Sequence, residues 1–241
     1  MARAFFISDI HFGLESKERE LRKQERVFTF LDHVREHGSE LFIVGDLFDA
    51  WFEYETVIPR GFHRLLTKLE DLTRGGVTVH YIVGNHDAWI RNFFQDDLGV
   101  RTYRDPFAVT IDGKKIYIHH GDGLAEKDGG YRLLKKILRN RFNIRLYSWI
   151  HPDIGLWLAR ASSRKSRDYT STKDYGESDG MIRLATEKIG EGFDAVVMGH
   201  RHKPESRAIG AGVYINLGDW ITYNTYAELA GGTIQLKEWS T

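Results

Sequence analysis

Short apolar runs alternate with segments of helical periodicity over most of the chain. The run at 4–8 is followed by a helical pattern at 17–36 and then by a second apolar run at 41–44. Continuous apolar runs of this length predict strands buried on both faces, as in a parallel sheet. Pro59 predicts the start of a second helix, which Gly75 ends. Strands and helices that alternate in this way are typical of an α/β domain.

The rest of the chain continues the alternation without an internal repeat. The elements expected are a strand at 77–83, a hairpin at 107–119 around Asp112-Gly113, a helix at 181–189, and strands at 194–198, 213–217, 222–229 and 232–239. At 241 residues, the chain is long enough for one large domain.

Polar side chains follow five of these predicted strands. They are Asp9, His11, Asp46, Asn85, His120, His200 and His202. Ligands bind beyond the carboxyl ends of strands in open α/β sheets, so we expect these groups to converge. Imidazole, carboxylate and amide ligands without thiolate favour Mn²⁺, with Fe or Zn²⁺ as alternatives. Seven ligands exceed the needs of one ion and fit two ions that share a carboxylate, about 3.5–4 Å apart.

The motifs DxH, GD, GNHD, HGD and GHxH, in this order, resemble the calcineurin-like metallophosphoesterase superfamily. The resemblance implies a four-layer α/β/β/α sandwich with two metal ions. It implies that one ion is held by Asp9, His11, Asp46 and His202, and the other by Asp46, Asn85, His120 and His200. Asp46 would be the bridge. His86, with Asp87 beside it, matches the superfamily's catalytic histidine, which contacts the phosphate and protonates the leaving oxygen.

The histidines outside this pattern need a different interpretation. Side chains alternate along a strand, so His119 and His120 should point in opposite directions, and the motif position selects His120. The others are expected at the surface or in packing: His33, His37, His63, His80 and His151.

Composition narrows the location and the classes of partner. The chain has no cysteine, its N-terminus does not resemble a secretory signal, and no apolar run reaches the ~20 residues of a membrane-spanning helix. A cytoplasmic location is therefore expected. Net charge is zero, but residues 131–170 contain ten Lys or Arg against two Asp. This basic segment predicts an anionic partner surface.

Four stretches resemble a narrower family, UDP-2,3-diacylglucosamine hydrolase, a pyrophosphatase of the lipid A pathway. They are GDLFDAWF (45–52), HGDGLAEKDGGYRLLKKILRN (120–140), GHRHKPE (199–205) and LGDW (217–220). The resemblance implies that hydroxide formed at the metal ions attacks the α-phosphate of UDP-2,3-diacylglucosamine, releasing UMP and 2,3-diacylglucosamine 1-phosphate. It also implies one domain, 1–241, with a helical cap inserted at 129–175. The implied substrate contacts are Asn85, His86, Asp128, Tyr131, Ser166, Thr170, Lys173 and His200.

The cap segment itself carries an apolar stripe among basic residues, with Pro152 as the expected break between two helices. Trp and Leu on one face with Lys and Arg on the other suit a helix at an anionic membrane. The segment would then cover the acyl chains of a nucleotide-sugar lipid at the inner face of the cytoplasmic membrane. The alternative is an ordinary helical hairpin packed on the core.

Three alternatives to the lipid hydrolase reading remain. The lipid hydrolases usually carry GNRD, whereas this chain carries GNHD at 84–87. The same site could therefore act on a different phosphomonoester or phosphodiester. A nuclease would use the basic segment as a phosphate track, but the aromatic residues are spaced for packing rather than for stacking on bases. A non-catalytic scaffold should have lost metal ligands, and all seven are present. No protein partner is predictable from the sequence.

Overall fold

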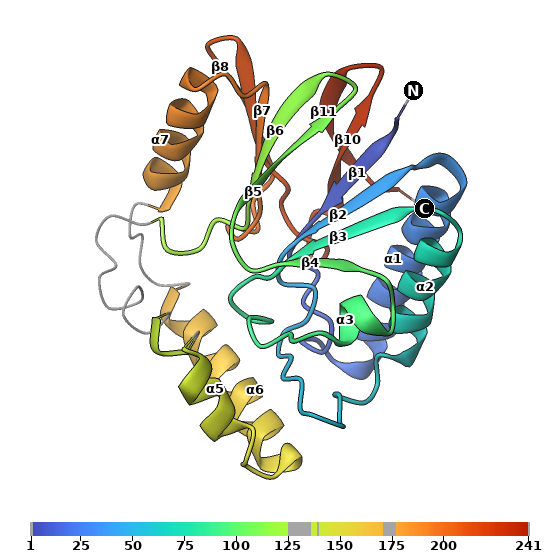
Figure 1. The fold of residues 1–241 in the computed structure, drawn as a ribbon, viewed down its shortest axis with the longest axis vertical. Coiled ribbons are helices and arrows are strands. Elements are labelled where there is room, and N and C mark those ends of the chain that lie inside the picture. The colour runs from blue at the N-terminus through green and yellow to red at the C-terminus, as the bar shows by residue number, and fades with distance from the viewer. Residues whose placement is uncertain (1, 125–135, 139, 171–176, 241) are drawn as a thin grey trace.

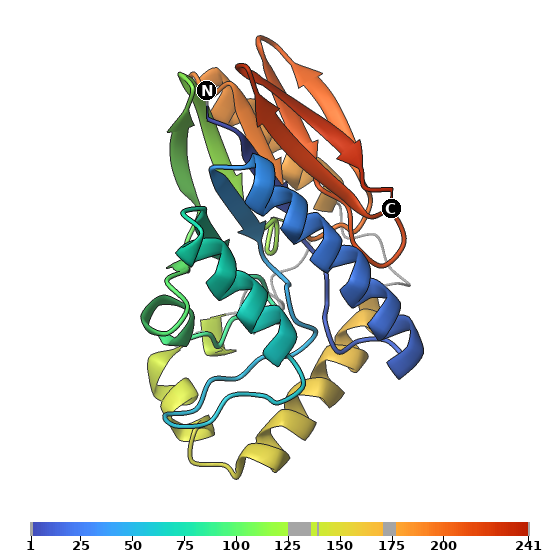
Figure 2. The same cartoon turned by 90° about the vertical axis from the view of Figure 1, so that its right-hand side faces the viewer.

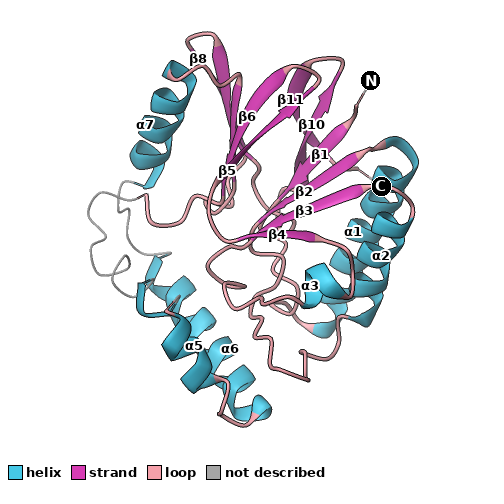
Figure 3. Ribbon diagram, in the orientation of Figure 1, coloured by secondary structure: helices cyan, strands magenta, loops and turns pink. Residues whose placement is uncertain are grey.

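The computed structural model describes residues 2–124, 136–138, 140–170 and 177–240. In this part of the chain, two β-sheets lie face to face, and helices cover the outer face of each sheet (Figures 1 and 3). The expected four-layer α/β/β/α sandwich is therefore confirmed.

The first sheet contains the N-terminal strands and the last two strands of the chain. Its order is β11-β10-β1-β2-β3-β4. The bounds are β1 (Ala4–Ile7), β2 (Glu40–Val44), β3 (Thr78–Ile82), β4 (Arg101–Tyr103), β10 (Thr225–Ala230) and β11 (Thr233–Glu238). Strands β1 to β4 are parallel, whereas β10 pairs antiparallel with β1. The parallel strands therefore carry the ends of β1, β2 and β3 to the same edge.

The second sheet has the order β5-β6-β7-β9-β8. Its strands are β5 (Phe107–Ile111), β6 (Lys114–His119), β7 (Ala195–Met198), β8 (Glu205–Ile209) and β9 (Gly212–Asn216). The three central strands, β6, β7 and β9, are parallel, and the two edge strands are antiparallel to their neighbours. Parallel pairing again carries the ends of β6 and β7 to one edge.

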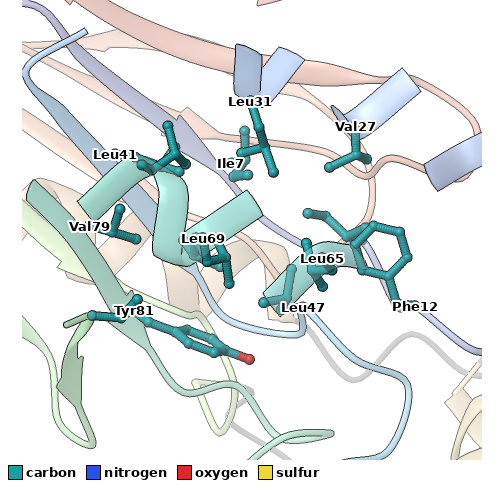
Figure 4. Packing of buried hydrophobic residues seen from close by; sticks show 14 of the residues in the cluster. Ile7, Phe12, Val27, Leu31, Leu41, Leu47, Leu65, Leu69, Val79 and Tyr81 are labelled. Carbon is teal, nitrogen blue, oxygen red and sulfur yellow. The ribbon is translucent and has the colours of Figure 1, made fainter. Parts of the chain in front are cut away.

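The alternation of side chains divides the first sheet between two hydrophobic cores. In β1, Phe5 and Ile7 face the helices, while Ala4 and Phe6 face the second sheet. Helices α1 (Lys17–His37) and α2 (His63–Arg74) lie side by side over the first sheet (Figure 2). Their buried side chains pack on those of the sheet (Figure 4). Helix α7 (Glu177–Gly190) covers the second sheet through a smaller core.

Two further helices lie beyond the metal-ligand end of the sandwich, apart from the sheets (Figure 1). They are α5 (Arg141–Tyr147) and α6 (Pro152–Thr170), so the expected break at Pro152 is confirmed. The Tyr147 hydroxyl donates to Gly155 O at 2.6 Å, and Trp89 Nε1 donates to Leu138 O at 2.9 Å. The first bond joins α5 to α6, and the second joins the segment before α5 to the sandwich. We call α5 and α6 the cap; the limits 129–175 stay a prediction.

Some boundaries differ from the expected ones. Helix α2 begins at His63 rather than at Pro59, because Gly61 between them has a φ of 103° that no helix continues. Strand β10 begins at Thr225 rather than at residue 222, because Asp219 Oδ1 accepts from the backbone N–H groups of Ile221, Thr222 and Tyr223 in a turn. The short elements α3 (Phe93–Asp96), β4 and β8 were not predicted.

Candidate metal centre

The loops that follow the strands hold their polar residues in unusual backbone conformations. Five of the seven expected ligands have a positive φ, between 49° and 72°: Asp9, His11, Asp46, His200 and His202. Such conformations are uncommon outside glycine and cluster at functional sites. Here they turn each side chain sharply from the end of its strand toward the same point.

One group of side chains forms around His11. Its Nε2 atom lies 3.2 Å from His202 Nε2 and 3.8 Å from Asp9 Oδ1. His202 Nε2 and Asp9 Oδ1 are themselves 3.7 Å apart. The ligand atoms of these three residues all lie within 4.8 Å of one another, so together they could hold a single metal ion.

A second group forms around His120. Its Nε2 atom lies 3.3 Å from Asp46 Oδ2 and 3.1 Å from Asn85 Oδ1. His200 joins Asp46 and His120 within ligand range. The same oxygen of Asp46, Oδ2, is 3.7 Å from His11 Nε2 in the first group. Asp46 thus lies between the two groups, where a bridging carboxylate must be.

The chemistry of these groups fits divalent cations. Asp9 and Asp46 are almost completely buried, and Asp9 Oδ1 has no hydrogen-bond donor among the described residues. A buried carboxylate oxygen without a donor is costly unless a cation offsets its charge. Mn²⁺, Fe and Zn²⁺ all accept this ligand set.

The buried imidazoles and carboxylates shift one another's pKa values. Burial alone would lower the pKa of His120, but the neighbouring carboxylates, Asp46 first, raise it to about 10. For Asp46 the opposite holds: burial would raise its pKa, and the imidazoles of His120 and His86 bring it well below the usual range. A ligand imidazole must lose its proton when a metal binds, so metal binding here releases protons.

Backbone and side-chain groups hold the ligands in place. Val44 O accepts from His120 Nδ1 at 2.8 Å, and Asp219 Oδ2 lies 3.4 Å from His202 Nδ1. Each contact occupies the ring nitrogen that faces away from the centre, which leaves Nε2 for a metal. His200 N donates to Asp9 Oδ2 at 2.8 Å. The ligands therefore support one another across the two sheets.

Asp87 lies beneath the loop that carries Asp46. Its carboxylate accepts from Leu47 N at 2.8 Å, from Gly84 N at 2.7 Å and from the Tyr81 hydroxyl. Burial, with the charge of Asp46, raises the pKa of Asp87 to about 6. The structure thus places Asp87 where it fixes the loop; the predicted catalytic role stays a prediction.

His86 lies against the first group. Its ring is 4.7 Å from that of His11, and it falls within ligand range of His11 and Asp46. Its Nδ1 atom is 3.0 Å from Asp49 O and 3.0 Å from Ser163 Oγ. His86 therefore lies at the metal centre, and its Nδ1 atom is held by Asp49 O and Ser163 Oγ.

The remaining predicted residues fall into separate places. His120 lies in a group that could hold a metal ion, while His119 accepts from Gly121 N at 2.7 Å; His120 as a ligand stays a prediction. His80 stacks on Phe42 in the core. Of the predicted substrate contacts in the cap, Ser166 and Thr170 belong to α6. Asp128, Tyr131 and Lys173 lie outside the described residues.

Sequence reasoning missed three residues that surround the ligands: Asp49, Asp219 and Ser163. Asp49 and Asp219 both lie within stretches that carry the family resemblance, GDLFDAWF and LGDW, so an acidic residue near a ligand was the available signal. Ser163 has no such signal, because its two partners are 114 and 77 positions away in the chain.

The two sheets bring carboxylates, imidazoles and an amide to one buried point, in groups that could each hold a metal ion. Such a ligand set is that of a metal-dependent hydrolase. A sequence profile of the family described as Calcineurin-like phosphoesterase matches residues 2–204. The chain belongs to this family.

Curated relatives resemble the chain over nearly its whole length. A UDP-2,3-diacylglucosamine hydrolase of Porphyromonas gingivalis is 31% identical, and the alignment covers 98% of this chain and 97% of the relative. A second, from Nitrosococcus oceani, is 28% identical over 90% of this chain and 86% of the relative. Among solved structures, an archaeal phosphodiesterase aligns over 98% of both chains with a TM-score of 0.49 and 14% identity.

Proposed function

We propose that the protein hydrolyses the pyrophosphate of UDP-2,3-diacylglucosamine to UMP and 2,3-diacylglucosamine 1-phosphate, using two Mn²⁺ ions. The name of the relatives gives the substrate. The observation that supports it in this chain is the apolar surface of the cap and of the residues on either side of α5. Eight large apolar side chains of residues 137–158 are exposed: Ile137, Leu138, Phe142, Leu146, Trp149, Ile154, Trp157 and Leu158.

This surface suits a lipid substrate taken from a membrane. Phe142, Trp149 and Trp157 are 68%, 75% and 61% exposed, and a large exposed apolar patch marks an interaction surface. Ten basic residues lie in the same segment, 131–170. An apolar face with flanking positive charge binds to anionic bilayers from the surface. No helix in the described ranges is long and apolar enough to span a bilayer. We therefore propose peripheral contact at the cytoplasmic face.

The residues at the centre can be given parts in this reaction. Two divalent ions, when bound, neutralise the phosphate and lower the pKa of water to near neutrality. Asp46 fixes the separation of the two ligand groups, since its Oδ2 faces both. His86 presents its free ring nitrogen beside the first group and donates a proton to the oxygen that leaves. Asn85 and His200 contact the phosphate oxygens, and Asp128, Tyr131, Ser166, Thr170 and Lys173 contact the rest of the substrate.

The experiment is hydrolysis in H₂¹⁸O by protein loaded with Mn²⁺. The products are identified by mass spectrometry. We expect UMP carrying one ¹⁸O, because attack at the α-phosphorus places the new oxygen there. Asp46→Asn is the inactive control. Label in the lipid phosphate would contradict the proposed point of attack, and an intact nucleotide lipid alongside a cleaved simple diester would contradict the substrate. Sedimentation with anionic vesicles, lost in Trp149→Ser/Trp157→Ser, tests the membrane contact.

One observation favours a second function. The chain has His86 where the lipid hydrolases usually carry Arg, and its ring is held by Asp49 and Ser163 in the manner of a proton donor. A histidine can transfer a proton, and an arginine cannot. Proton donation helps poor leaving groups most, so hydrolysis of an alkyl phosphomonoester or phosphodiester is the alternative. A panel of such esters beside the nucleotide lipid separates the two.

A further inference from the structure

Helix α6 of the cap places a buried hydroxyl group, that of Ser163, beside the metal centre. Ser163 of α6 is only 7% exposed, whereas its neighbour Ser162 is exposed. Ser163 Oγ lies 2.9 Å from Asp49 Oδ1 and 3.0 Å from His86 Nδ1. It therefore connects the cap to two residues that follow β2 and β3.

The directions of these hydrogen bonds follow from the partners. His86 Nδ1 is also 3.0 Å from Asp49 O, and a backbone carbonyl can only accept, so Nδ1 must carry a proton. Ser163 then donates its own proton to the Asp49 carboxylate and offers its oxygen to His86. The order imidazole, hydroxyl, carboxylate is fixed, and Nε2 is the ring nitrogen left for the substrate.

We propose that Ser163 is a positioning residue, through which the docked cap sets the tautomer and the orientation of His86. This inference rests on the proposed function, in which His86 donates a proton to the leaving oxygen. The proton leaves from Nε2 of the doubly protonated ring, and Nδ1 keeps the proton that it shares with Asp49 O and Ser163 Oγ. Ser163 itself does not touch the reacting atoms. The hydroxyl reaches His86 because α6 is docked on the sandwich, so the packing of α6 sets the orientation of this ring.

A double-mutant cycle tests whether Ser163 acts through His86. The substrates are UDP-2,3-diacylglucosamine and uridine 5′-phosphate phenyl ester, which has a poor leaving group. We expect Ser163→Ala to lower kcat about 10–100-fold, the usual effect of removing a group that orients a ligand or catalytic residue, with KM unchanged. In the His86→Ala background, the same change should leave kcat within about twofold. Ser162→Ala is the matched control for a serine lost from α6.

The cycle separates positioning from a structural effect. An equal loss of kcat in both backgrounds overturns the inference, since Ser163 would then act independently of His86. Metal content is measured in every variant because Asp49 Oδ1 also lies 3.8 Å from His11 Nδ1. A coupled cycle on the phenyl ester with no turnover of the nucleotide lipid would refute the substrate while supporting the role of Ser163.

A second readout does not depend on activity. Long-range ¹H–¹⁵N spectra of the histidine rings distinguish the two tautomers of His86. We expect the Nδ1–H tautomer in the wild-type protein, a shifted Nδ1 resonance in Ser163→Ala, and no shift in Ser162→Ala. A wild-type ring protonated at Nε2 alone, or a resonance unaffected by Ser163→Ala, overturns the inference.

Discussion

A single methyl group added at Gly84 should displace Asp46, the carboxylate that lies between the two ligand groups. A Cβ atom at this position would lie 2.0 Å from Asp46 Oδ1 and 2.6 Å from Asp46 N. Non-bonded heavy atoms settle at about 3.5 Å, so Asp46 must withdraw by more than about 1 Å. The same carboxylate accepts from His86 N at 2.9 Å, so His86 would move with it.

The expected magnitude follows from that displacement. Misplacing a catalytic group by about 1 Å costs on the order of 10² in rate, and we expect at least this loss of kcat in Gly84→Ala. Overpacking in a dense interior costs about 1–3 kcal/mol, so the protein should remain folded with a Tm several degrees lower. Metal content should fall because neither ligand group keeps its shared oxygen.

The assay combines kcat, metal analysis and thermal unfolding on the same preparation. Gly190→Ala is the matched control, because a Cβ at this end of α7 meets nothing within 4 Å. It should leave all three measurements unchanged. If Gly84→Ala kept both metal ions and full activity, Asp46 would not be held where the structure places it, and the assignment of the bridge would be wrong.

Three further outcomes are expected. A chelator should abolish activity in the wild-type protein and Mn²⁺ should restore it, whereas Asp46→Asn should stay inactive with metal added, as atomic emission and a turnover assay would show. His86→Ala should lower kcat by about 10²–10⁴, most for poor leaving groups; equal losses across leaving groups would indicate phosphate binding instead. Leu69 is a fully buried side chain of α2, so Leu69→Ala should cost about 2–5 kcal/mol of unfolding free energy in urea and leave kcat unchanged.

The sequence predicted the parts of the fold in which local pattern and tertiary packing agree. β1, β2 and β7 are continuous apolar runs buried on both faces, and the residues after them form the metal centre. It did not predict β8, because Glu205–Ile209 is an edge strand whose polar side chains face water and carry no alternating apolar pattern. Strand β4 has three residues and is too short for any periodicity.

The sequence predicted those residues of the site whose type is itself a sign of function. Aspartate and histidine after a buried strand are informative because such groups are costly to bury without a purpose. Asp87 shows the limit, since its sequence position beside His86 does not reveal that backbone N–H groups and Tyr81 occupy its oxygens. Ser163 shows it again: a serine in a helix carries no signal, and only the docking of α6 brings it to Asp49.

The predicted ligands are divided between the two halves of the sandwich. Asp9, His11, Asp46 and Asn85 follow strands of the six-stranded sheet, while His120, His200 and His202 follow strands of the five-stranded one. Cations bound by residues of both sheets would link the two sheets, and they would stabilise only the folded chain because the unfolded chain has no such site. At a free metal concentration 100 times the dissociation constant, one such site adds about 2.7 kcal/mol. Resistance of this protein to heat should therefore depend on the metal supply of its surroundings.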